Sequence, residues 1–258
     1  MPDIAPLEPE DRDLPLREMP PAAMQRLAAS VQPMVFETGA PAAPYSTIGT
    51  AFYVGCGGRT FAVTARHTLR PDSLHPVCLF PADGSRRLLP LTNVFYVPAE
   101  LEGEETLDLA IVEIDMDVAK SDSELGQTLL IDMELAVPVS RPPLSRSSLV
   151  VVGYPAQLSS IDYEAEEIQN ERFALRGQYV GVTSTHYLHE MRVLDEHRLD
   201  SFSGLSGAPV FGWHESDSDK GRVFLCGMAV QGTVTSGLIR FMDAEIVVQA
   251  IRAMIARR

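Results

Sequence analysis

Short apolar runs separated by Gly- and Pro-containing turns dominate the chain from Met34 onward. The runs consist mainly of Val, Ile, Phe, Tyr and Thr, and turn signals recur roughly every ten residues, as in proteins built from short β-strands. The pattern therefore predicts an all-β protein. The expected strands cover 47–54, 60–65, 75–80, 87–97, 107–114, 147–153, 173–185, 190–199, 208–213, 223–231 and 237–242.

Three further segments do not follow the strand pattern. Residues 1–20 are rich in Pro, Glu and Asp and are expected to form a solvated arm, followed by a short amphipathic helix near 21–31. The polar stretch 116–145 ends in a Pro-rich sequence and is typical of a connection between domains. From Asp243 to Arg258, apolar residues recur at spacings of three and four, which predicts a helix. The predicted organisation is an arm with a short helix (1–32), a first barrel (33–115), a linker (116–146), a second barrel (147–242) and a C-terminal helix (243–258).

Length and charge exclude several classes of partner. The chain has 258 residues, enough to bury a large core, and no apolar run reaches the roughly 18 residues that a membrane-spanning helix needs. Its 35 Asp and Glu residues outnumber its 21 Lys and Arg residues, which gives a net charge of −14. Such a surface repels phosphate backbones, so we expect neither a nucleic acid nor a membrane as a partner. The acidic run 100–124 is expected to be a solvated linker face, or alternatively a collar that attracts basic peptides.

The N-terminus and the cysteines bear on the compartment. No basic segment followed by an apolar one begins the chain, so a native start at Met1 predicts a cytoplasmic protein; a secreted chain trimmed of its signal peptide would look the same. Cys56, Cys78 and Cys226 are odd in number and lack metal-ligand spacing, so each is expected to be a small buried side chain. We expect no disulfide framework, no metal and no cofactor.

Three polar residues stand where the apolar pattern would not place them. His67 comes just past the end of an apolar strand, where a side chain is fixed and yet reaches solvent. Asp108 begins an otherwise apolar strand and therefore needs a hydrogen-bonded partner, with Asp115 and Asp117 as nearby alternatives. Ser206 has glycines on both sides, which permit a tight turn and the close approach of a substrate backbone.

These three residue types together can carry out acyl transfer. A serine hydroxyl is a poor nucleophile until a base lies within hydrogen-bond reach. An imidazole can take that proton and return it to the leaving amine, and a buried carboxylate fixes the imidazole tautomer. The backbone N–H groups of Gly204 and Ser206 are candidates for the oxyanion hole, where one such donor is worth about 3 kcal/mol of barrier.

Chain order and sequence context now point to a family. His67, Asp108 and Ser206 follow one another at distances of 41 and then 98 positions, and over about residues 45–242 the chain resembles the chymotrypsin-like (trypsin-fold) serine peptidases. The motifs that carry the resemblance are Thr64-Ala65-Arg66-His67, Asp108-Leu109-Ala110 and Gly204-Leu205-Ser206-Gly207-Ala208-Pro209. The resemblance implies two six-stranded antiparallel β-barrels with the active site between them, followed here by the C-terminal α-helix. It also implies that Ser206 is the nucleophile, His67 the general base and acid, and Asp108 the orienting carboxylate.

The same resemblance has implications for substrate binding. Val230, Gln231 and Gly232 would pair with the backbone of a peptide substrate by β-augmentation. Asp200 stands at the position that forms the floor of the S1 pocket in trypsin-type enzymes, and an Asp there favours Arg or Lys at P1. Leu205 is a departure, because activated secreted members carry an Asp there that pairs with a newly cut N-terminus. In this departure and in its lack of the family's disulfides, the chain resembles bacterial intracellular trypsin-like peptidases more than secreted ones.

The expected function is a serine endopeptidase that acts on a peptide or protein substrate through an acyl-enzyme. Two alternatives remain at this point. The chain could be a protease-fold module that binds a peptide or partner protein without cutting it, or an enzyme held latent until an activating partner protein orders the oxyanion loop. Fluorophosphonate labelling of Ser206 separates a competent enzyme from an inactive module.

Overall fold

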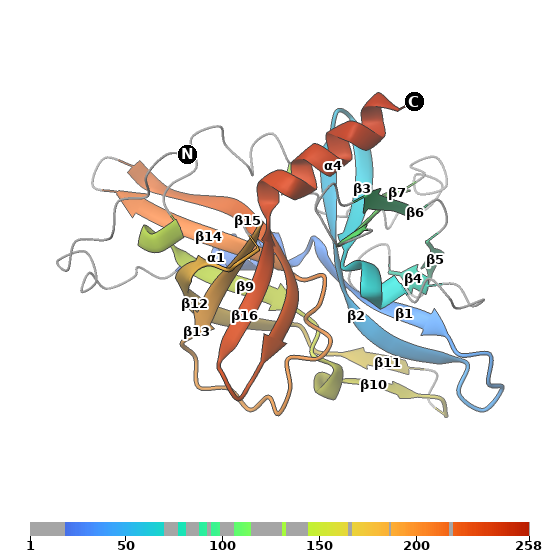
Figure 1. The fold of residues 1–258 in the computed structure, drawn as a ribbon. Coiled ribbons are helices and arrows are strands. Elements are labelled where there is room, and N and C mark those ends of the chain that lie inside the picture. The colour runs from blue at the N-terminus through green and yellow to red at the C-terminus, as the bar shows by residue number, and fades with distance from the viewer. Residues whose placement is uncertain are drawn as a thin grey trace.

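The computed structural model of the protein describes residues 19–69, 77–80, 88–91, 94–98, 106–114, 131–132, 144–164, 167–185, 187–216 and 219–257. Over these residues the chain forms an N-terminal sheet, a C-terminal barrel and a helix that runs from the barrel toward the sheet (Figure 1). The predicted all-β class with a C-terminal helix is confirmed. The predicted arm, apart from its last two residues, and most of the predicted linker lie outside the described residues. No helix in the described ranges is long and apolar enough to cross a membrane.

The N-terminal unit begins with helix α1 (Pro21–Ala28), which has a proline at its start, where the missing N–H costs no hydrogen bond. Its eight-stranded sheet has the order β5-β4-β1-β2-β3-β7-β6, and β8 pairs in parallel with β2. The strands are β1 (Val31–Glu37), β2 (Tyr45–Cys56), β3 (Arg59–Thr64), β4 (Val77–Leu79), β5 (Leu89–Pro90), β6 (Val94–Pro98), β7 (Thr106–Ile114) and β8 (Ile131–Asp132).

This sheet differs in detail from the expected six-stranded barrel. The run predicted as one strand over 87–97 is two strands, β5 on β4 and β6 on β7, and β1 and β8 were not predicted. Pro90 ends the first of these two strands, because proline has no N–H to donate to the next pair of a ladder. Among the described residues no pairing joins β5 to β6, so the hydrogen-bonded ring is not closed there.

The hairpin β2–β3 leads into the turn that carries His67. Gly57 and Gly58 join the two strands with φ of +57° and +73°, and Cys56 pairs with Arg59. Two consecutive residues with positive φ form the type I′ turn that suits the twist of antiparallel strands. This turn fixes the register of β3, whose other end leads to His67.

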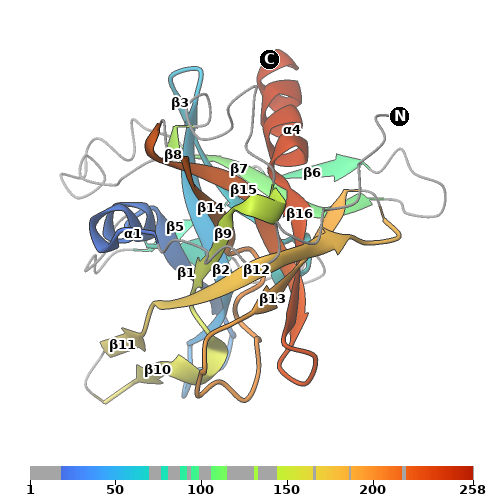
Figure 2. The same cartoon turned by 90° about the vertical axis from the view of Figure 1, so that its left-hand side faces the viewer.

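The C-terminal unit is the predicted six-stranded antiparallel barrel. It is closed in the order β12-β13-β16-β15-β14-β9. A separate hairpin of β10 (Ser159–Asp162) and β11 (Glu167–Asn170), which was not predicted, projects away from it (Figure 2). The barrel strands are β9 (Ser148–Gly153), β12 (Phe173–Val182), β13 (Leu188–Val193), β14 (Pro209–Ser216), β15 (Asp219–Thr233) and β16 (Leu238–Asp243).

Helix α4 (Ala244–Ala256) follows β16 directly and is capped by the Asp243 side chain, which accepts from the Glu245 N–H at 2.8 Å. Its buried face belongs to one apolar core that also contains residues of β2, β3 and β7 and of the barrel strands β9, β14 and β15. Two further cores fill the barrel and the outer part of the N-terminal sheet. The three cysteines are buried and free, as predicted.

Candidate active site

His67 reaches the surface because a buried strand ends just before it. The side chains of β3 from Thr60 to Thr64 are buried, and the chain then forms a short 3-10 helix, Arg66–Leu69. The backbone N–H and the hydroxyl of Thr68 both donate to Ala65 O, at 3.2 and 2.6 Å, and hold this turn. The His67 side chain therefore stands on a fixed backbone, while 52 % of it remains exposed to a substrate.

Asp108 holds His67 through two hydrogen bonds. Strand β7 pairs with β3, which places Asp108 beside the turn that carries His67. Asp108 Oδ2 accepts from His67 Nδ1 at 2.8 Å, and Oδ1 accepts from the His67 backbone N–H at 3.0 Å. This network assigns the Nδ1 tautomer, so Nε2 is the ring nitrogen that can take a proton. The alternatives Asp115 and Asp117 lie outside the described residues.

The contact shifts the pKa of both partners. The hydrogen bond to Asp108 outweighs burial and raises the pKa of His67 above its ordinary value of 6.5. Burial by itself would raise the pKa of Asp108, but hydrogen bonds from the ring and backbone of His67 lower it below its ordinary value. At neutral pH the carboxylate is therefore charged, and it makes the imidazole a stronger base.

Two consecutive turns present Ser206 at the end of the barrel. Leu205 and Ala208 each donate a backbone hydrogen bond to the carbonyl three residues earlier, at 3.1 and 2.9 Å. The third residues of the two turns are Gly204 and Gly207, with φ of +90° and +87°. This arrangement is typical of type II turns, in which the third residue has positive φ and is usually glycine.

Close packing adds a second reason for both glycines. A Cβ on Gly204 would lie against Tyr154 O and 2.5 Å from Ala156 N, while one on Gly207 would collide with Thr50 O. The turn is thus enclosed between β2 of the N-terminal unit and the segment that follows β9 in the barrel. Glycine is therefore required on both sides of Ser206 for two reasons, the positive φ of the turns and the lack of space for a side chain.

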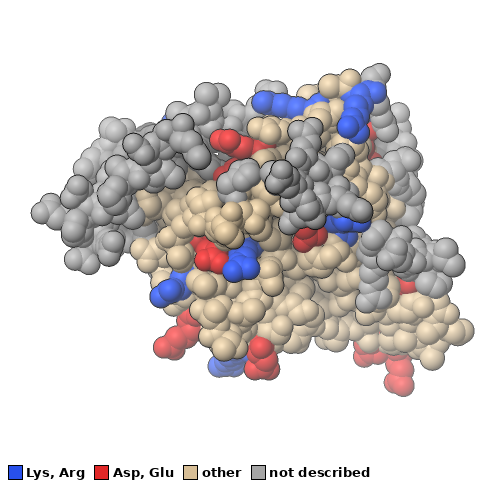
Figure 3. Space-filling view, in the orientation of Figure 1, with Lys and Arg blue, Asp and Glu red and all other residues tan. Residues whose placement is uncertain are grey.

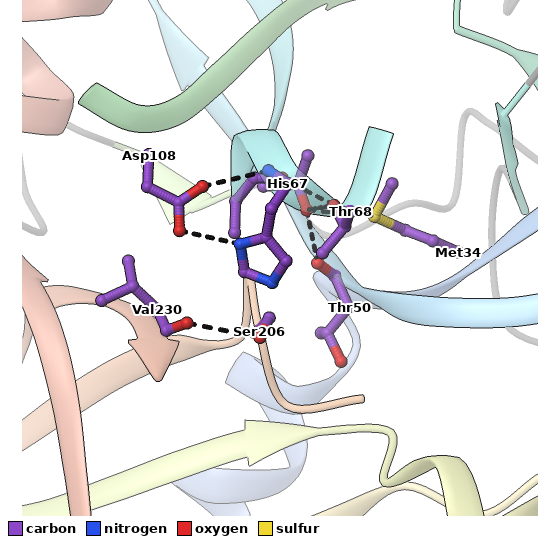
Figure 4. Close-up of polar contacts among 9 residues, drawn as sticks. Met34, Thr50, His67, Thr68, Asp108, Ser206 and Val230 are labelled. Atoms are coloured by element: carbon purple, nitrogen blue, oxygen red, sulfur yellow. Dashed lines mark hydrogen bonds and ion pairs between the residues drawn. The ribbon is translucent and has the colours of Figure 1, made fainter. Parts of the chain in front are cut away.

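The hydroxyl of Ser206 and the imidazole of His67 face the same cleft. In Figure 4 the Nε2 side of the His67 ring lies toward Ser206. Within the described part of the chain the hydroxyl donates to Val230 O, at a long 3.4 Å, and makes no hydrogen bond to His67. Catalytic hydrogen bonds are often long without substrate and tighten when it binds.

The two backbone N–H groups predicted to form the oxyanion hole, those of Gly204 and Ser206, make no hydrogen bond within the described residues. The carbonyls on the far side of the same peptide groups are occupied: Ser203 O accepts from the Ala156 N–H at 2.8 Å, and Leu205 O accepts from Ala208. Because the C=O and N–H of a trans peptide point in opposite directions, both N–H groups are turned away from these contacts.

The three predicted catalytic residues line one cleft of about 650 Å³. Apart from His67 and Asp108, the described residues that line it are uncharged, and they include the predicted binding residues Val230, Gln231 and Gly232. The pairing of β15 with β14 ends at Met228. Beyond that point this edge of β15 has no strand partner among the described residues, which leaves it open to a peptide.

Val230 forms a β-bulge on the other side of β15, in its ladder with β16. In the ladder between β15 and β16, Ala229 pairs with Phe241 and Gln231 with Arg240, so Val230 is the extra residue. A bulge re-aims the backbone locally. Here the Val230 carbonyl is the acceptor for the Ser206 hydroxyl.

The structure does not bring Asp200 into the cleft. Its neighbours Leu199 and Phe202 are buried in the barrel core, and this packing leaves the Asp200 side chain exposed. The Asp200 backbone N–H donates to Gln157 Oε1 at 2.7 Å, and it is Ser201 that lines the cleft. The distance along the chain from Ser206 therefore does not place Asp200 among the described residues that line this cleft.

The described residues on the face shown in Figure 3 form no acidic collar. On the face shown in Figure 3, acidic and basic side chains of the described residues are interspersed. The acidic run 100–124 is described only over residues 106–114.

No group of three His, Cys, Asp or Glu residues in the described ranges is arranged to hold a metal ion.

Sequence reasoning missed Thr50, which contacts the serine turn from β2. Its hydroxyl donates to Gly204 O at 2.7 Å, and its backbone N–H donates to Ser206 O at 3.0 Å. Thr50 stands in the Gly-Thr-Ala-Phe run that the sequence does mark as a strand, but a threonine there is an ordinary strand residue. Only a contact across 154 positions of sequence gives it a part in the site.

Comparisons with known proteins agree with this architecture. No protein-family model and no curated protein matches the chain. The crystal structure of tobacco vein mottling virus protease matches with a TM-score of 0.51 and 12 % identity, over 89 % of this chain and 82 % of that one. That of the thermostable serine protease AL20 from an extremophilic microorganism matches with a TM-score of 0.52 and 12 % identity, over 87 % and 96 %. The fold of this chain is therefore the chymotrypsin-like protease fold.

Proposed function

We propose that the protein is a serine endopeptidase in which Ser206, His67 and Asp108 form the catalytic triad. The observation that carries this proposal is the double hydrogen bond between Asp108 and His67 in the cleft that Ser206 also lines. An exposed imidazole with a raised pKa, beside a glycine-flanked serine, is the arrangement that nucleophilic catalysis requires.

Acylation follows from this geometry. Ser206 Oγ attacks the carbonyl carbon of the scissile bond while His67 Nε2 takes the hydroxyl proton. The tetrahedral oxyanion then accepts hydrogen bonds from the N–H groups of Gly204 and Ser206, each worth about 3 kcal/mol of barrier. When the C–N bond breaks, His67 returns the proton to the leaving amine and the acyl group stays on Ser206.

Deacylation uses the same groups with water as the nucleophile. His67 takes a proton from a water molecule, whose oxygen attacks the ester carbonyl of the acyl-enzyme. Collapse of the second tetrahedral intermediate releases the carboxylic acid, and His67 returns the proton to Ser206 Oγ. Asp108 stays ionised throughout and stabilises the imidazolium formed in each half of the reaction.

The free edge of β15 at Val230–Gly232 is the proposed site for the substrate backbone. A peptide that adds a strand there gains main-chain hydrogen bonds whatever its side chains are. Besides His67 and Asp108, the described residues that line the cleft are uncharged, which supports uncharged substrate side chains. The preference for Arg or Lys at P1 rested on Asp200, and the exposed position of that residue gives it no support.

The test is labelling by a fluorophosphonate together with hydrolysis of a peptide library. We expect the wild-type chain to react and Ser206→Ala to be unreactive, with both proteins showing the same unfolding temperature. His67→Ala should also fail to react, because the hydroxyl then lacks its base.

One observation favours an alternative, a protease-fold module that binds a peptide without cutting it. Ser206 donates its hydroxyl to Val230 O and not to His67. A wild-type chain that binds library peptides but neither cleaves them nor reacts with the probe would establish this alternative.

A further inference from the structure

Thr50 is completely buried, and all of its polar groups contact segments that build the active site or support it. Its backbone N–H donates to Ser206 O at 3.0 Å, and its hydroxyl donates to Gly204 O at 2.7 Å. The same hydroxyl accepts from the Tyr154 N–H at 2.9 Å, and the Thr50 carbonyl accepts from the Thr64 hydroxyl at 2.8 Å. One residue of the N-terminal sheet thus holds two carbonyls of the serine turn and one N–H of the segment after β9.

These contacts constrain the peptide groups on each side of the oxyanion donors. The carbonyls of Gly204 and Ser206 both point to Thr50, while those of Ser203 and Leu205 are held by Ala156 and Ala208. All four carbonyls from 203 to 206 therefore have a partner, and the direction of each peptide plane is set. Among the backbone N–H groups from 203 to 206, those of Gly204 and Ser206 are the two that donate to no acceptor in the described ranges.

Leu205 shows why such a tether is needed. In the family that the sequence resembles, activated members carry a carboxylate at this position, whereas the Leu205 side chain is apolar and buried in the barrel core. An apolar contact anchors the side chain, yet it does not decide how the peptide groups around it are turned. Directional hydrogen bonds do decide this, and in this turn the Thr50 side chain supplies one of them.

We infer that Thr50 is a positioning residue, whose hydroxyl holds the Gly204–Ser206 turn in the orientation that presents its N–H groups to an oxyanion. The inference rests on the proposed function for its catalytic consequence, and on the hydrogen bonds alone for its structural part. The tether is built into the folded chain, so it needs neither a cleaved N-terminus nor a second protein.

The deciding variants are Thr50→Val and Thr50→Ser. Valine keeps the shape and removes the hydroxyl, which leaves Gly204 O and the Tyr154 N–H buried without this partner. Serine keeps the hydroxyl and should restore the tether. Tyr53→Phe is the matched control, because Tyr53 lies in the same strand, is buried, and loses one hydroxyl bond to a carbonyl, Phe80 O at 2.7 Å, away from the serine turn.

Two readouts separate catalysis from positioning. For Thr50→Val we expect kcat for peptide hydrolysis to fall about 10- to 100-fold with KM changed less than about 2-fold, because oxyanion donors act on the transition state. Hydrogen exchange at the Leu205 and Ala208 amides, which close the two turns, should become about 10-fold faster. Thr50→Ser should return both values to near wild type, and Tyr53→Phe should change neither.

Each other result has a definite meaning. A folded Thr50→Val protein with unchanged kcat and unchanged exchange overturns the inference. So does a loss of kcat that is equally large in Tyr53→Phe, since general destabilisation would then explain it. If the wild-type chain neither cleaves peptides nor reacts with the probe, the proposed function fails. The exchange of Leu205 and Ala208 in Thr50→Val then still decides whether the residue positions the turn.

Discussion

Asp108 binds His67 at two places at once, the ring through Nδ1 at 2.8 Å and the backbone through its N–H at 3.0 Å. One carboxylate therefore sets both the tautomer of the imidazole and the path of the chain that carries it. Loss of the carboxylate charge and loss of the side chain should have different effects, and this difference can be measured.

Asp108→Asn should lower kcat about 10,000-fold while the protein stays folded. The amide oxygen can still accept from the His67 backbone N–H, but the amide nitrogen then faces Nδ1 and favours the wrong tautomer. Steady-state kinetics on a peptide substrate, with an unfolding curve for the same preparation, tests this. Asp108→Ala removes the backbone contact too and is the comparison; equal stability of the two variants would argue against a role for the second hydrogen bond.

The pH dependence of the reaction should report the same pair. His67 must be neutral to accept the serine proton, and the hydrogen bond to Asp108 raises its pKa above 6.5. Activity (kcat/KM) should therefore rise with pH through a midpoint above that value, and protonation should abolish it below. Because Asn carries no charge, the midpoint in Asp108→Asn should be lower than in the wild type. NMR titration of the His67 ring in Ser206→Ala gives the pKa without activity, and a value below 6.5 would contradict the assignment.

Gly204→Ala should lower kcat by at least about 100-fold, with a smaller change in KM. The new Cβ would meet Tyr154 O and Ala156 N, and the φ of +90° strains any other residue, so the turn must shift. Gly237→Ala is the control, because Gly237 also has positive φ (+64°) but no atom lies within 4 Å of the added Cβ. Similar losses of kcat in the two variants would mean that backbone strain alone, and not the place of Gly204, matters.

The cleavage profile should not depend on Asp200. The Asp200 side chain is exposed, and the described lining of the cleft carries no charged residue besides His67 and Asp108. We therefore expect wild type and Asp200→Ser to cleave the same library peptides, with uncharged residues at P1. Peptide-library profiling by mass spectrometry makes the comparison directly. A wild-type preference for Arg or Lys that disappears in Asp200→Ser would restore the sequence-based assignment of the pocket floor.

The sequence predicted the elements whose own residues determine them. Strands such as β3 and β9 are short apolar runs, and α4 has a helical spacing of buried residues, so local pattern was sufficient. The strand β1 was missed because it begins soon after a helix and contains Pro33, which ordinarily argues against a strand. Hairpin β10–β11 was missed because its residues alternate between intermediate and exposed positions and form no apolar run.

In the candidate site too, residues in local motifs could be predicted, whereas residues placed by tertiary packing could not. His67, Asp108 and Ser206 stand in recognisable motifs, and the structure brings all three to one cleft. Asp200 was placed by its distance along the chain, but the burial of Leu199 and Phe202 decides where its side chain points. Thr50 could not be found at all, since its role depends on the docking of β2 against a turn 154 positions away.

The shared core beneath α4 has a consequence for motion. His67, the proposed base, belongs to the N-terminal sheet and Ser206, the proposed nucleophile, to the barrel, so any hinge between the units would separate them. Helix α4 directly follows the barrel strand β16, yet its buried face packs with β2, β3 and β7 of the N-terminal unit. Its residue Ile255 lies close to Gly57 in the β2–β3 turn. The helix thus holds the two units in a fixed relative orientation. We expect products to leave along the cleft without a hinge motion that separates the units.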